Sequence, residues 1–84
     1  MKFKEALNER RIVWKIKNKD DLEKLGSKDT MIFGPTKTPE EALDKVEGKM
    51  AEWIIVKIGN QYFGVTGSRL DPENVGGKVL NINL

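Results

Sequence analysis

The chain has 84 residues and 38% hydrophobic residues, which suits one small folded domain, and we expect that domain to span residues 1–84. Its formal net charge of +2 is too small to indicate a class of partner, and the absence of cysteine and histidine excludes disulfides, thiolate chemistry and histidine-based metal sites. There is no long apolar run and no apolar stretch typical of a signal peptide, so we expect a cytoplasmic protein with no membrane association.

The N-terminal segment predicts a helix and then a strand. Phe3, Ala6 and Leu7 have helical spacing, which predicts a short amphipathic helix over residues 2–10. Residues 11–17 alternate between apolar and polar side chains, which predicts a strand with one buried face. The expected buried side chains are Ile12, Trp14 and Ile16, and the expected outer side chains are Arg11, Val13, Lys15 and Lys17.

Two short elements are expected next. Residues 19–26 predict a short helix, because Leu22 and Leu25 are three positions apart and acidic residues stand early in the segment. Residues 30–34 predict a short strand that ends at Pro35, since proline cannot donate a hydrogen bond to a neighbouring strand.

The clearest local pattern in the chain is the start of a helix within residues 38–52. Thr38 is the expected N-cap, Pro39 suits the first helical position, and Glu41 completes a capping box. Gly48 is expected to weaken the last turns by about 1 kcal/mol relative to alanine. The expected apolar stripe consists of Ala42, Leu43, Val46 and Met50.

Residues 52–67 predict two antiparallel strands joined by a two-residue turn at Gly59 and Asn60. The predicted pairs are Lys57 with Tyr62, Val56 with Phe63, Ile55 with Gly64, Ile54 with Val65, and Trp53 with Thr66. One face is expected to be core and consists of Ile54, Val56, Ile58, Phe63 and Val65. The opposite face is mixed and consists of Trp53, Ile55, Lys57, Tyr62, Gly64 and Thr66.

The C-terminal segment predicts a polar loop and a last strand. Residues 68–77 are expected to form the loop, and residues 78–84 alternate in the manner of a half-buried strand. Together these elements predict an α+β domain with two layers. Its sheet is expected to be mainly antiparallel, with four to five strands and with two or three helices on one face.

The residue types available for catalysis are limited to carboxylates. Most of the acidic residues stand where helix starts and turns favour an acid, so their positions need no catalytic explanation. We therefore expect that the protein is not an enzyme and that it uses no metal and no cofactor.

The charge distribution indicates one candidate binding face. Residues 1–37 contain ten basic and six acidic residues, whereas residues 38–84 contain five and seven. If residues 11–17 join the same sheet as the hairpin, their outer side chains extend its mixed face. The candidate site residues on this face are Arg11, Lys15, Lys17, Trp53, Lys57 and Tyr62. The alternative is that a helix or the N-terminal segment covers the face. A second candidate is the loop around Arg69, whose guanidinium could hold a carboxylate or a phosphate.

Our leading expectation is a small binding protein that acts on another protein as an inhibitor, adaptor or regulator, of the kind that phages and mobile elements often encode. Tryptophan, tyrosine and arginine are the residues that dominate such interfaces. The alternative is a protein that binds single-stranded nucleic acid, with bases stacked on aromatic rings and cations along the phosphates. A third possibility is self-assembly through strand edges at residues 30–34 and 78–84. The sequence predicts no particular oligomeric state.

Overall fold

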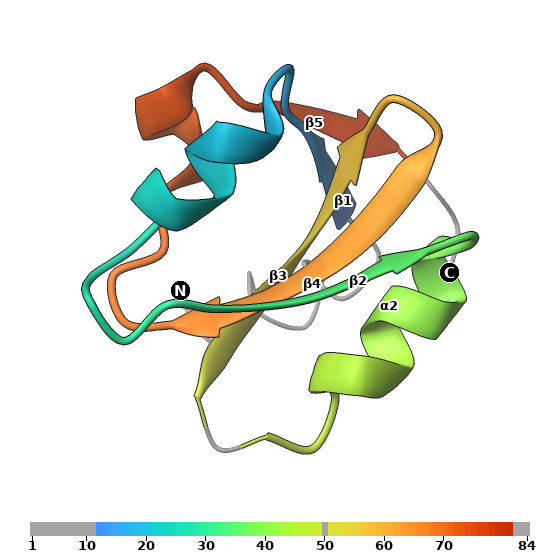
Figure 1. Ribbon diagram of the computed structural model, residues 1–84, viewed down its shortest axis with the longest axis horizontal. Coiled ribbons are helices and arrows are strands. Elements are labelled where there is room, and N and C mark those ends of the chain that lie inside the picture. Colours follow the sequence, from blue (N-terminus) through green and yellow to red (C-terminus); the bar gives the residue numbers. More distant parts are fainter. Residues whose placement is uncertain (1–11, 50, 82–84) are drawn as a thin grey trace.

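Five strands form one mixed sheet in the order β2-β4-β3-β1-β5 (Figure 1). The computed structural model describes residues 12–49 and 51–81. The strands β1 and β3 are parallel, and the other three neighbouring pairs are antiparallel. The strand bounds are β1 Ile12–Lys15, β2 Met31–Thr36, β3 Glu52–Ile58, β4 Gln61–Gly67 and β5 Lys78–Asn81. The described helices are the α-helix α2 (Pro39–Val46) and the 3₁₀ helices η1 (Lys19–Lys24) and η2 (Pro72–Val75).

The hairpin of β3 and β4 has the predicted register at every pair. Val56 lies opposite Phe63, and Lys57 lies opposite Tyr62. Gly59 has a φ of 60°, which a tight two-residue turn requires and which glycine adopts without steric cost.

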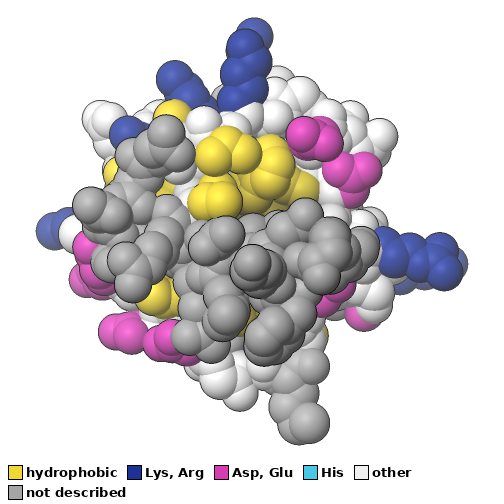
Figure 2. All heavy atoms as spheres, turned by 180° about the vertical axis from the view of Figure 1, so that it is seen from behind, with side chains coloured by type: hydrophobic (Ala, Val, Ile, Leu, Met, Phe, Trp, Pro, Cys, Tyr) yellow, Lys and Arg dark blue, Asp and Glu magenta, His cyan; other side chains and the backbone are white. Residues whose placement is uncertain are grey.

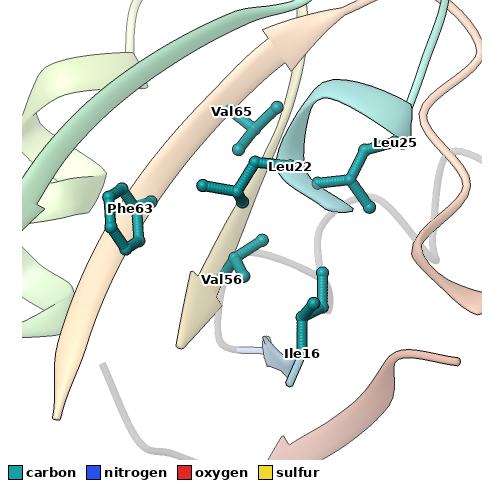
Figure 3. Packing of buried hydrophobic residues seen from close by; sticks show 6 residues of the cluster. All are labelled: Ile16, Leu22, Leu25, Val56, Phe63 and Val65. Carbon is teal, nitrogen blue, oxygen red and sulfur yellow. The ribbon is translucent and has the colours of Figure 1, made fainter. Parts of the chain in front are cut away.

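The face predicted to be core carries the first hydrophobic core. Val56, Phe63 and Val65 meet Leu22 and Leu25 of the η1 segment there (Figure 3). Ile16, directly after β1, completes this cluster, and Val75 of η2 packs against it. This core therefore lies between the sheet and the two 3₁₀ helices.

A second hydrophobic core lies on the opposite face of the same sheet. It joins Val13 and Ile55 of the sheet to Ala42 and Val46 of α2. Figure 1 shows α2 on one side of the sheet and both 3₁₀ helices on the other. The expectation of a two-layer domain with helices on one face is thus wrong, because both faces of the central strands carry apolar side chains that must be covered.

The prediction of one buried face for residues 11–17 is also wrong. Val13, expected on the outer face, has no exposed surface, whereas Ile12 and Trp14 are half-buried. The reason is the position of β1 inside the sheet, between β3 and β5, where both of its faces meet other elements.

The helix α2 begins as predicted and ends earlier. The Thr38 side chain accepts a hydrogen bond from the Glu41 N–H, and the Glu41 carboxylate accepts one from the Thr38 N–H, which is the complete capping box. The helix ends at Val46 instead of continuing toward residue 52. The chain leaves the helical conformation at Glu47, whose ψ is 135°, and Gly48 follows with a φ of 89°.

Smaller differences concern β2 and the C-terminal loop. Pro35 does not end β2 but lies within it, at an irregularity between Phe33 and Thr36 on this edge strand. The loop before β5 contains the short helix η2. The predicted helix over residues 2–10 and the end of the last strand, residues 82–84, lie outside the described residues. Within the described part of the chain, no helix has the length and apolar character to span a membrane.

We expect Thr38→Ala to reduce the free energy of unfolding by about 1 kcal/mol, because the N–H of Glu41 loses its partner. Urea denaturation of the wild type and the variant measures this change. Thr38→Ser keeps the accepting hydroxyl and serves as the control. An equal loss in both variants would contradict a role for the cap.

We expect Phe63→Ala to reduce the free energy of unfolding by about 3–5 kcal/mol, because its ring is fully buried in the first core. Gln61→Ala, at an exposed position of the same strand, is the matched control. Chemical denaturation compares the two variants, and a loss below about 1 kcal/mol for Phe63→Ala would contradict this packing.

Candidate functional site

The helix α2 covers the centre of the candidate face. A Cβ atom placed on Gly64 would lie 2.6 Å from Cγ1 of Val46 and 2.9 Å from the carbonyl oxygen of Ala42. Gly64 is therefore needed for close approach of helix and strand, and no space for a flat ligand remains opposite Ile55. The predicted alternative, a face covered by a helix, holds for this central part.

The two aromatic candidates on this face belong to the second core. Trp53 and Tyr62 are half-buried and pack against the cluster of Val13, Ala42, Val46 and Ile55. Their packing against this core leaves only part of each ring for a partner. Trp53 also lies four residues from Lys57 along β3, so the two side chains project from positions separated by about 13 Å.

Three lysines occupy directly neighbouring positions at one end of the sheet. Lys57 on β3 is paired with Lys15 on β1, and Lys15 is paired with Lys78 on β5. Paired residues share one face, so these three side chains, which we term the lysine row, project on the side that α2 covers elsewhere. Lys15 and Lys78 are exposed and Lys57 is half-buried. Neighbouring strands are about 4.8 Å apart, so the row spans about 10 Å.

Tyr62 extends the lysine row on the next strand. Tyr62 is paired with Lys57, and the Nζ atom of Lys57 lies 5.6 Å from the centre of the Tyr62 ring. At this separation the ammonium is attracted by the ring face, which holds Lys57 near the β3–β4 turn seen in Figure 1. Tyr62 thus positions a cation in addition to filling the second core.

The remaining predicted residues of this face have different outcomes. Arg11 lies outside the described residues, and Lys17 is exposed beyond the end of β1. Lys78 was not predicted as a site residue. The alternation of residues 78–84 places it on the same face as Leu80, but its position beside Lys15 depends on the order of the strands, which no local pattern encodes.

Arg69, the second candidate, lies in the turn after β4. It is exposed and has a φ of 56°. Ser68 donates hydrogen bonds from its N–H and its hydroxyl to the two carboxylate oxygens of Asp29. These hydrogen bonds from Ser68 lower the pKa of Asp29 below its ordinary value. The turn is thereby attached to the loop between η1 and β2.

The rest of the described surface and interior provides no candidate metal site. Figure 2, which views the molecule from behind, shows basic and acidic side chains around the rim and a group of hydrophobic side chains in the upper part of the view. Within residues 12–49 and 51–81, no three acidic side chains converge in a way that could hold a metal ion. No buried side-chain nitrogen or oxygen in this part lacks a hydrogen-bond partner.

We expect Gly64→Ala to reduce the free energy of unfolding by about 1–3 kcal/mol, because the added methyl group would overlap α2. Thermal unfolding measures the loss. In a Val46→Ala background the same substitution should cost less, since one of the two close contacts is gone. Full additivity of the two changes would contradict the proposed contact.

Comparison with known proteins supplies no relative for this chain. No protein-family model, no curated protein and no solved structure matches it.

Proposed function

We propose that this chain is a non-enzymatic protein that binds nucleic acid through the lysine row. The observation that supports the proposal is the register of Lys57, Lys15 and Lys78 on three adjacent strands. Like charges placed directly opposite one another destabilise a sheet, so local folding energetics do not favour this arrangement. An anionic partner offsets this repulsion, because its charge is attracted to all three ammonium groups.

The spacing of the row suits a phosphate backbone. The row presents three ammonium groups within about 10 Å, so a nucleic-acid strand that crosses it meets three cations in succession. Lysine is a compact charge that contacts phosphates without strict geometry, whereas it is depleted in protein–protein interfaces. A row made of lysine alone therefore favours a polyphosphate over an acidic protein surface.

The shape of the surface favours a single strand. Lys57, Lys15 and Lys78 all belong to strands of the sheet, so none of them is carried by a helix that could enter the major groove of a duplex. A single strand can lie across β5, β1 and β3, with its phosphates on the lysines and a base against the exposed part of Tyr62. Because phosphate contacts carry no sequence information, binding is expected to be largely independent of sequence.

A protein partner is the second candidate, and the edge strand β2 favours it. Met31 and Ile32, neighbours on this strand, are 58% and 38% exposed. An extended segment of another protein could pair with the free edge and cover both. Such a partner would use the opposite edge of the sheet from Lys78.

The test is a titration of a labelled single-stranded oligonucleotide at several salt concentrations, followed by fluorescence anisotropy. Lys15→Gln and Lys78→Gln should each weaken binding and reduce the slope of log K against log salt by about 0.7, the value for one lost phosphate contact. Lys24→Gln is the control, because this exposed lysine belongs to η1 on the other face.

Two outcomes would contradict the proposal. One is that the wild type fails to bind the oligonucleotide even at low salt. The other is that the control weakens binding as much as the variants of the lysine row, which would indicate attraction by overall charge. A duplex of the same length should bind more weakly than the single strand.

A further inference from the structure

Arg69 has an unusual backbone conformation for a residue with a side chain. Among the described residues, a positive φ occurs at five glycines, namely Gly34, Gly48, Gly59, Gly67 and Gly76. The only other described residue with a positive φ is Arg69, at 56°. A side chain with a Cβ atom is disfavoured in this left-handed region, and glycine or asparagine would fit the same backbone with less strain.

The neighbours of Arg69 hold it in this conformation. Ser68 is fixed by its two hydrogen bonds to Asp29 and by its carbonyl oxygen, which accepts a hydrogen bond of 3.0 Å from the Ser27 N–H. On the other side, the Asp71 N–H donates to the carbonyl oxygen of Leu25 at 2.6 Å. Both flanks of Arg69 are thus tied to residues 25–29, while its own side chain is exposed.

This arrangement does two things for a guanidinium. It orients the first bonds of the side chain before any ligand arrives, which reduces the entropy that binding would cost. It also places arginine in a backbone conformation that glycine or asparagine adopts with less strain, which is a feature found at binding sites. Arginine matches planar oxyanions, because its N–H groups form two parallel hydrogen bonds with a carboxylate or a phosphate.

We propose that Arg69 is the anchor of a second binding site that takes an oxyanion group, a carboxylate or a phosphate, presented by a partner molecule. The site is separate from the lysine row. Tyr62, which adjoins the row, and Gly67, at the far end of β4, are five residues apart, or about 16 Å along the strand. Arg69 lies two residues further along the chain, so one small anion cannot contact both sites.

The experiment is a titration of the ¹⁵N-labelled protein by NMR with sodium phosphate, sodium acetate and, at equal ionic strength, sodium chloride. The Arg69 Nε–H and the Ser68 amide should shift with a saturable dependence on at least one oxyanion. Saturation by phosphate alone assigns a phosphoryl ligand, and saturation by acetate assigns a carboxylate such as an acidic peptide side chain. Shifts that equal those in chloride would overturn the proposal.

Two variants separate binding from structure. Arg69→Asn tolerates the left-handed backbone and should keep or raise the melting temperature while weakening oxyanion binding roughly tenfold or more. Arg69→Lys keeps the positive charge but loses the paired N–H donors. Its affinity for the oxyanion should therefore lie between that of the wild type and that of Arg69→Asn. A lower melting temperature for Arg69→Asn, or unchanged oxyanion binding, would show that Arg69 serves the fold and would overturn the proposal. Lys15→Gln should weaken the binding of nucleic acid by the lysine row and leave the oxyanion-dependent shifts of the Arg69 Nε–H and the Ser68 amide unchanged.

Discussion

The structure depends on the register of the β3–β4 hairpin. In a strand, successive side chains point to opposite faces, so the adjacent residues Ile55 and Val56 enter different cores. Both are fully buried. A slip of one residue would exchange the two faces and place Lys57 and Tyr62 in the first core. The tight turn at Gly59 and Asn60 fixes the register, and both layers of helices pack on the result.

The helix α2 packs on only part of the second face. A helix of eight residues is about 12 Å long, whereas the sheet is five strands wide, or about 19 Å between its edge strands. The helix packs on β2, β3 and β4, where Gly64 allows the closest approach. Lys15 and Lys78 belong to β1 and β5, beyond these three strands. Both lysines are exposed.

The sequence correctly predicted those features of the fold that depend on interactions between residues close together in the chain. The capping box at Thr38 and the pairs across the β3–β4 turn involve residues close in the chain, and both were predicted correctly. The parallel pairing of β1 with β3 joins segments about forty residues apart, and no local pattern specifies it. For this reason the burial of Val13 and the place of Lys78 beside Lys15 were missed. The positive φ of Arg69 was equally hidden, because arginine is not a residue that indicates such a conformation.

The two candidate sites, the lysine row and Arg69, are the places where residue types do not match the local conformational and electrostatic preferences that hold elsewhere in the described chain. Elsewhere, glycine occupies the positive-φ positions, the described α-helix has a complete cap, and buried polar side chains of the described residues have partners. The lysine row keeps like charges opposite one another, and Arg69 keeps a side chain where glycine or asparagine would fit better. Each departure is a local cost that the cores on both faces of the sheet tolerate. Each also concerns a cation and leaves its side chain wholly or partly accessible. Both departures place a cation at a position that local backbone and cross-strand energetics alone do not favour.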